Sequence, residues 1–177
     1  IDDQSSVSVS MSSNGSIVAI GAGNNDANGT TAGHVRVYEY VNSTWVQKGS
    51  DIEGEAAGDG SGDSVSMSSD GLTVAIGAIY NDGNGSDSGH VRVYEYVNLT
   101  WVQKGSDIDG EAAGDLSGYS VSISSDGLTV AIGACKNDGN GDEAGHVRVY
   151  EFGPTDWTQK GSDIDGEAAG DESGSSV

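Results

Sequence analysis

A unit of 56 residues recurs three times along the chain, and this internal repeat constrains the fold more than any other feature. The segment Gly-His-Val-Arg-Val-Tyr-Glu begins at Gly33 and returns at Gly89 and at Gly145. Residues 64–119 and 120–175 align without a gap and are identical at 42 of 56 positions. A repeat of this length is typical of propellers, solenoids and modular arrays, in which each unit packs against its neighbours.

Each unit contains four segments with the composition of β-strands, rich in β-branched and aromatic residues. In the second unit these segments are residues 64–68, 72–78, 90–96 and 101–106. Asp70-Gly71 separates the first two segments and is a strong signal for a β-hairpin. No segment has the periodicity of an amphipathic helix, so the sequence predicts an all-β fold.

The second strand of each unit, such as residues 72–78, is apolar along nearly its whole length. A strand of this kind is covered on both faces, which a lone four-stranded sheet cannot achieve. Sheets arranged radially as propeller blades do achieve it, because each sheet lies between its neighbours. We therefore predict four-stranded antiparallel propeller blades. One tryptophan per unit is expected to fill the wide outer gap between blades, namely Trp45, Trp101 and Trp157.

The order of short motifs in each unit resembles the FG-GAP repeat of integrin α-subunit-like β-propellers. In the third unit the matching motifs are Ser117-Gly118-Tyr119-Ser120-Val121, residues 130–134, residues 145–150 and Trp157-Thr158-Gln159. Two features depart from the family pattern. Ser117 stands where the family has Phe, and the loop in which the family frequently binds calcium is shortened to residues 68–71. The resemblance implies a propeller, but calcium is not expected in that shortened loop.

The whole chain, residues 1–177, is expected to form one repeat array. We place the blades at about residues 8–63, 64–119 and 120–175, with the start of a fourth blade at 176–177. Because propellers usually have 4–8 blades, three blades are too few to close a ring. The expected partners are therefore further blades of a larger parent chain or a second copy that closes the ring.

The charge of the chain is strongly negative and unevenly distributed. With 28 acidic and 7 basic residues, the formal net charge is −21. This composition argues against binding to nucleic acid or docking on an anionic membrane, and no apolar run approaches the ~20 residues that span a bilayer.

Most of the acidic residues fall in two kinds of loop. Because strand directions alternate, the loops after the second and the fourth strand of a unit lie on the same side of a blade. We call this side the acidic loop face, made of residues 23–33, 79–89 and 135–145 together with residues 51–63, 107–119 and 163–175. Integrin-like propellers use this face for ligands, so the resemblance implies that this chain binds ligands there too.

Some loops of the acidic loop face have the side-chain spacing that opens a calcium-binding loop. The candidate ligands after the second strands are Asp138, Asn140 and Asp142, then Asp82 and Asn84, then Asp26. A second candidate set after the fourth strand is Asp107, Asp109 and Asp115. The distant Glu of an EF-hand is absent, and Asn-Gly and Asp-Gly are also ordinary turn formers. The alternative is a solvated acidic face that keeps a secreted protein soluble. Calcium is the one cofactor that the sequence suggests.

Five Asn-x-Ser/Thr sequons fall in expected turns or loops, as glycan acceptors of a secreted protein do. We favour glycosylation at Asn42 and Asn98, and the other sequons are at Asn14, Asn28 and Asn84.

No group of catalytic residues stands out. The histidines recur at one position of each unit, and the single cysteine, Cys135, aligns with Gly23 and Ile79, so we expect these side chains to be structural. The histidines are His34, His90 and His146. One arginine per unit is expected to pair with a nearby acid such as Glu39, Glu95 or Glu151. These arginines are Arg36, Arg92 and Arg148.

The sequence therefore favours a non-enzymatic extracellular or cell-surface module for adhesion, protein binding or structural assembly. A protein or glycan would bind at the acidic loop face, where repeated weak contacts add through avidity. The first alternative is a carbohydrate-binding propeller with pockets between blades that contain Tyr80 or Tyr119. The second is a polysaccharide lyase or hydrolase that uses two carboxylates, which near-identical repeats disfavour because an active site needs residues that differ between blades.

Overall fold

The structure, a computed structural model, describes residues 8–177. These residues form 15 β-strands and no helix, so the predicted all-β fold is confirmed. Accordingly, residues 8–177 contain no helix that could cross a bilayer. The first seven residues of the predicted array lie outside the described part of the chain, and Ser176 and Val177 form no strand.

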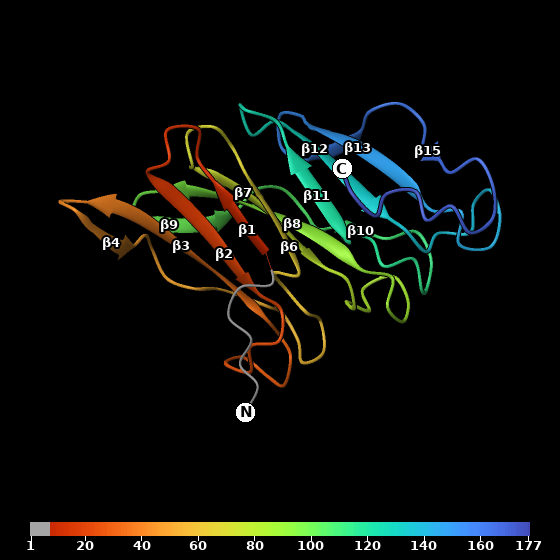
Figure 1. Ribbon diagram of the computed structural model, residues 1–177, viewed down its shortest axis with the longest axis horizontal. Helices are drawn as coiled ribbons and strands as arrows, with labels where there is room; N and C mark the ends of the chain where they lie inside the picture. Colours follow the sequence, from red (N-terminus) through yellow and green to blue (C-terminus); the bar gives the residue numbers. More distant parts are fainter. Residues whose placement is uncertain (1–7) are drawn as a thin grey trace.

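The strands form three separate sheets that follow one another along the chain, and we refer to them as blades 1, 2 and 3 (Figure 1). Blade 1 contains β1 (Ser8–Met11), β2 (Ile17–Ala22), β3 (His34–Val41), β4 (Thr44–Gln47) and β5 (Ile52–Glu53). Blade 2 contains β6 (Ser64–Met67), β7 (Thr73–Ala78), β8 (His90–Val97), β9 (Thr100–Gln103) and β10 (Ile108–Asp109). Blade 3 contains β11 (Ser120–Ile123), β12 (Thr129–Ala134), β13 (His146–Phe152), β14 (Trp157–Gln159) and β15 (Ile164–Asp165).

Within each blade the strands pair antiparallel in chain order, as β6-β7-β8-β9 does in blade 2. The predicted hairpin at Asp70-Gly71 joins β6 to β7. Asp70 Oδ1 accepts hydrogen bonds from Ser68 Oγ and Leu72 N, and Gly71 has φ +74, a conformation that glycine adopts without strain. The turn therefore fixes the register in which Met67 faces Val74.

The outermost strand is split in two, which the sequence analysis did not predict. The expected strand at residues 101–106 ends at Gln103, and pairing with β8 resumes at Ile108, opposite Val91. Gly105 lies between the two pieces with φ +80, outside the extended region of backbone conformations. The second piece, β10, brings Asp109 opposite His90 and carries the chain to the acidic loop face.

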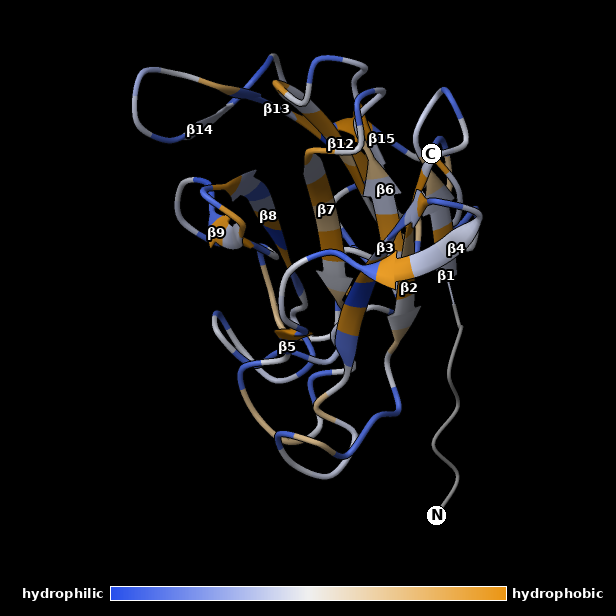
Figure 2. Cartoon of the chain, turned by 90° about the vertical axis from the view of Figure 1, so that its left-hand side faces the viewer, coloured by the Kyte–Doolittle hydropathy of each residue, from blue (hydrophilic) through white to orange (hydrophobic). Residues whose placement is uncertain are grey.

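Neighbouring blades pack face to face around two hydrophobic cores. The core between blades 1 and 2 contains Ile17, Ala19, Val35, Val37, Ile52, Val65, Met67, Val74, Ile76 and Trp101. The core between blades 2 and 3 contains Ala75, Val91, Val93, Ile108, Val121, Ile123, Val130, Ile132 and Trp157. All six residues of β7 are buried, so the prediction that this strand is covered on both faces is confirmed. Figure 2 shows the hydrophobic residues gathered on the strands and the hydrophilic residues in the loops.

The predicted tryptophan wedges are present at both junctions. Trp101 Nε1 donates a hydrogen bond of 2.7 Å to the carbonyl of Lys48 in blade 1, and Trp157 Nε1 donates one of 2.6 Å to Lys104 in blade 2. Trp45, in the first blade, has no preceding blade within residues 8–177 to pack against and is 44% exposed. The same side chain is therefore buried wherever a neighbouring blade covers it.

Candidate functional site

The two kinds of loop on the acidic loop face are hydrogen-bonded into one surface. In blade 2, the backbone amides of Gly110, Gly114 and Ser117 donate to the carbonyls of Gly89, Ser86 and Ser88, with distances of 2.8–2.9 Å. Blade 3 repeats the arrangement, for example between Gly170 N and Asp142 O at 2.9 Å. Backbone pairing of this kind fixes loop positions, so the acidic side chains project from a defined frame.

Each loop after the outermost strand also binds the next blade. Asp115 is buried, and its Oδ2 accepts hydrogen bonds from Ala112 N at 3.0 Å and from Asn137 Nδ2 of blade 3 at 2.9 Å. Asp59 makes the equivalent bonds to Ala56 N and to Asn81 Nδ2 of blade 2. These two carboxylates therefore hold loops and blades together.

In the loops expected to bind calcium, the first aspartate closes its own loop. Asp138 Oδ1 accepts a hydrogen bond of 2.8 Å from Glu143 N, and Asp82 and Asp26 accept the equivalent bonds from Asp87 N and Thr31 N. Asn140 Nδ2 donates to Gly166 O at 2.7 Å, and Asn84 Nδ2 donates to Gly110 O at 2.8 Å. These amides thus join the two kinds of loop.

Calcium takes six to eight oxygen ligands, and few of the predicted aspartates lie in a cluster of His, Cys, Asp or Glu side chains. Groups of three or more His, Cys, Asp or Glu side chains with ligand atoms within 4.8 Å of one another occur at three places in residues 8–177. Asp107 belongs to one of these groups, whereas Asp26, Asp82, Asp109, Asp115, Asp138 and Asp142 belong to none. Calcium binding by the predicted residues stays a prediction.

The histidines are the functional candidates that the sequence analysis missed. His90 is buried beside Asp107 of its own blade and Glu55 of blade 1, and His146 is buried beside Asp163 and Glu111 of blade 2. Burial, and then the nearby Arg92, lower the pKa of His90, which favours the neutral imidazole. The acids come from the loops and from the neighbouring blade, so reading one unit at a time did not reveal them.

Each arginine lies beside an acid, as predicted, but the acid is not one of those named: it is Asp51 for Arg36, Glu55 for Arg92 and Glu111 for Arg148. Arg36 forms a 2.8 Å ion pair with Asp51, and this hydrogen-bonded guanidinium lowers the pKa of the Asp51 carboxyl. Arg92 Nη2 donates to the Glu53 carbonyl of blade 1, and Arg148 Nη2 donates to the Asp109 carbonyl of blade 2. Glu39 and Glu151 pair with lysines instead. For Arg92 and Arg148, the partners come from the preceding blade, whereas Arg36 pairs within its own blade.

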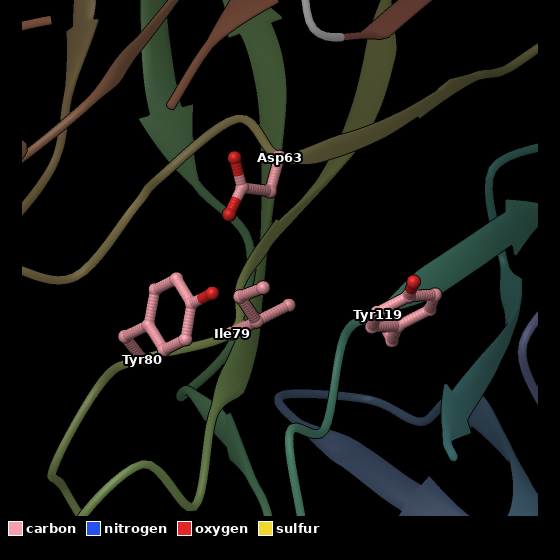
Figure 3. Close-up of a pocket in the computed structure, with 4 residues that line it drawn as sticks. All are labelled: Asp63, Ile79, Tyr80 and Tyr119. Carbon is pink, nitrogen blue, oxygen red and sulfur yellow. The ribbon is translucent and has the colours of Figure 1, made fainter. Parts of the chain in front are cut away.

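A pocket of about 380 Å³ is lined by Asp63, which directly precedes β6, by Ile79 and Tyr80, which follow β7, and by Tyr119, which directly precedes β11. In Figure 3 the two tyrosines lie on either side of Ile79, and Asp63 lies above it in the view. Both rings are about half exposed, whereas Ile79 is buried. Burial raises the pKa of Asp63 to about 6. The pocket thus combines aromatic walls with one carboxyl group, a composition suited to small ligands.

The residues that line this pocket are not repeated in the next unit. One unit later, Tyr80, Tyr119 and Ile79 are replaced by Lys136, Ser175 and Cys135. Lys136 Nζ lies 2.9 Å from Glu143 and 2.7 Å from Glu172, so an ion-pair cluster stands where Tyr80 stands in blade 2. Cys135 is buried, in agreement with a packing role.

The five sequon asparagines are all exposed but differ in their bonding. Asn28 Nδ2 and Asn84 Nδ2, the atoms to which a glycan would be attached, donate to loop carbonyls. Asn42 and Asn98 occupy two-residue turns between β3 and β4 and between β8 and β9, with φ 50, and Asn14 lies in the turn between β1 and β2. Glycosylation at Asn42 and Asn98 stays a prediction.

Comparison with known proteins supports the fold. A family model described as the FG-GAP repeat matches residues 53–94 and 103–150, and no curated protein matches the chain. Sqt1 of Saccharomyces cerevisiae is 17% identical, with a TM-score of 0.56 over 89% of this chain and 35% of Sqt1. A Bacteroides uniformis protein provisionally described as a 6-phosphogluconolactonase is 13% identical, with a TM-score of 0.59 over 91% of this chain and 41% of that protein. The chain spans less than half of either structure, and at this identity the likeness shows the β-propeller fold alone.

Proposed function

Since the two matched segments span about half of the chain, the protein belongs to the FG-GAP repeat family, and we propose that it is a non-enzymatic binding module of an extracellular or cell-surface protein. The proposed contact surface is the acidic loop face. The observation that carries the proposal is the hydrogen bonding between its two kinds of loop, as in Gly114 N to Ser86 O and Asn84 Nδ2 to Gly110 O. Preorganised loops lose little conformational entropy when a partner binds.

The charge of this face favours a basic partner. Asp142 and Glu167 are exposed on it, and the chain as a whole carries a formal charge of −21. Complementary charge speeds association and makes binding sensitive to salt. Because each blade presents the same loops, an extended partner can contact several blades at once, and its affinity gains from avidity.

Binding to immobilised lysine-rich and glutamate-rich peptides of equal length tests this proposal. We expect the chain to bind the lysine-rich peptide, less tightly as salt increases. The double variant D142N/E167Q should bind several-fold more weakly. Its control, E95Q/E151Q, carries the same net charge but changes acids near the opposite ends of the strands. Equal binding by both double variants, or no binding to the lysine-rich peptide, would refute the proposal.

The pocket at Tyr80 and Tyr119 supports a second candidate function, the binding of a neutral oligosaccharide. Aromatic faces pack against the apolar side of a sugar ring, and a carboxyl such as Asp63 hydrogen-bonds to hydroxyls. On a glycan array we expect Y80A and Y119A to lose signals that the wild-type chain gives. Y40A, which changes a similarly exposed tyrosine on the outer part of blade 1, should keep them. Silence of the wild-type chain across the array would remove this candidate.

A further inference from the structure

Two buried histidines at the blade junctions have ring nitrogens without hydrogen-bond partners. His90 and His146 are each 1% exposed. Within residues 8–177, His90 Nε2 and both ring nitrogens of His146 have no partner. Burying a polar group without a partner is unfavourable, and such a group in a native fold calls for an explanation.

Carboxylates from two blades surround each of these rings. Glu55 of blade 1 and Asp107 of blade 2 flank His90, while Glu111 of blade 2 and Asp163 of blade 3 flank His146. In each group, the three potential ligand atoms lie within 4.8 Å of one another. The same arrangement therefore occurs at both junctions, and each time one carboxylate crosses from the preceding blade.

The distances between these groups are too long for hydrogen bonds. His90 Nδ1 lies 3.9 Å from Asp107 Oδ2, and His146 Nδ1 lies 3.8 Å from Glu111 Oε2, whereas hydrogen bonds of this type measure about 2.7–3.2 Å. Ligands that each bind a metal at about 2.0–2.2 Å are themselves roughly 3–4 Å apart. The spacing thus fits an ion bound through Nδ1 of each ring. At His146 this nitrogen is also one without a partner in the described part of the chain, whereas at His90 the nitrogen without a partner is Nε2.

We propose that each interblade cluster binds one divalent transition-metal ion, with Zn²⁺ as the best-matched species. The first site consists of His90, Asp107 and Glu55, and the second consists of His146, Asp163 and Glu111. One imidazole with two carboxylates is a ligand set that zinc accepts, leaving a coordination position for water. Calcium is a poorer match because it prefers oxygen ligands alone.

The neighbouring arginines leave the carboxylates able to bind. Arg92 Nη1 is 3.4 Å from Glu55 Oε1, and Arg148 Nη1 is 3.6 Å from Glu111 Oε1. These distances are longer than hydrogen bonds, and each guanidinium donates instead to a backbone carbonyl. The positive charge weakens metal affinity without occupying the site.

Blade 1 has a related group, but it does not bridge blades. His34, Asp51 and Glu53 all belong to that blade. His34 Nδ1 and Glu53 Oε2 also have no partner within residues 8–177, but Asp51 is engaged by Arg36 at 2.8 Å and by Gln47, so this group has fewer free ligand oxygens. We therefore assign two metal sites to the chain, one at each junction.

Isothermal titration calorimetry with ZnCl₂ on the full chain, freed of metal by a chelator, tests the assignment. We expect two ions per wild-type chain, one ion for H90Q or H146Q, and no ion for the double variant. Co²⁺ should give visible absorption of a nitrogen- and oxygen-ligated ion that Zn²⁺ displaces. Zn²⁺ should also raise the midpoint of thermal unfolding, since it binds only the folded chain.

Two carboxylate variants keep the test decisive if a histidine variant does not fold. E55Q changes an exposed side chain of blade 1 and should remove or weaken only the site at His90. Its control, E95Q, removes one exposed charge outside the clusters and should bind two ions. No binding by the wild-type chain, or equal binding by E55Q and E95Q, would overturn the proposal. Peptide binding at the acidic loop face, measured in chelator, is independent of this result.

Discussion

At the scale of single residues, Asp63 couples the stability of the fold to pH. Burial raises its pKa to about 6 in the folded chain, whereas an unfolded Asp has a pKa of about 3.9. The folded state therefore holds this proton more tightly than the unfolded state. Through this group, the free energy of unfolding is highest below about pH 4 and falls as the pH rises to about 6.

The variant D63N should remove this pH dependence while keeping the size of the side chain. Relative to D63N, we expect the wild-type chain to lose about 1–2 kcal/mol between about pH 4 and about pH 6, less than the full linkage value because Asp63 is partly solvated. Urea unfolding of both proteins across this range measures the difference. A difference that is constant with pH, or that shifts in favour of the wild type as the pH rises, would contradict the prediction.

At the scale of strands and blades, the exposure of the tryptophan in each outermost strand depends on whether a preceding blade packs against it. Trp101 is 8% exposed and packs against blade 1, whereas Trp45 is 44% exposed. We expect W101A to cost about 3–5 kcal/mol, because it removes a large side chain from a core and leaves a cavity. W45A should cost about 1 kcal/mol or less. Chemical denaturation measures both values, and similar losses would show that the two positions are equivalent.

The elements that could be predicted from the sequence are those whose signals are local. Alternating and continuous apolar runs gave the strands, and Asp70-Gly71 gave the hairpin. By contrast, β10 has only two residues, Ile108 and Asp109, too few for any periodicity. Its presence is clear only from its pairing with β8.

The candidate site was predictable only in part, because some of its residues are far apart in the sequence and give no local signal. Alternating strand directions placed the acids in adjoining loops, which the hydrogen bonds between these loops support. Glu55 and His90, however, belong to different units, and stacking alone brings them together. The loop aspartates have calcium-like spacing, yet the backbone of their own loops already uses a carboxylate oxygen of Asp82 and Asp138.

At the scale of the whole molecule, the two end blades each have one uncovered apolar face. Ile164 of blade 3 is 58% exposed, while its equivalent Ile108 in blade 2 is 4% exposed because blade 3 covers it. On the other end, Val18, Ile20, Tyr38 and Trp45 line a shallow hollow of about 300 Å³ on blade 1. These two surfaces correspond to the two sides of the junctions already formed within the chain.

In a longer parent chain, further blades would cover these faces; for residues 1–177 alone, we expect a second copy to dock head to tail and close a ring of blades. Sedimentation equilibrium should show twice the mass of one chain at high concentration. I164D, which places a charge on the uncovered face of blade 3, should shift the chain to the monomer. V102D changes an exposed valine on an outer strand of blade 2 and should leave association unchanged. A wild-type chain that stays monomeric at all concentrations would show that the end faces do not recognise each other.

The two junctions also have a consequence for how such a chain can change in length. Trp101 meets Lys48 just as Trp157 meets Lys104, so the main packing contact at the boundary between units is the same at both junctions. Duplication or loss of one whole unit in the gene therefore creates no mismatched boundary. Relatives of this chain are expected to diverge in length by steps of one unit, with ring size rather than blade structure as the property that evolution varies.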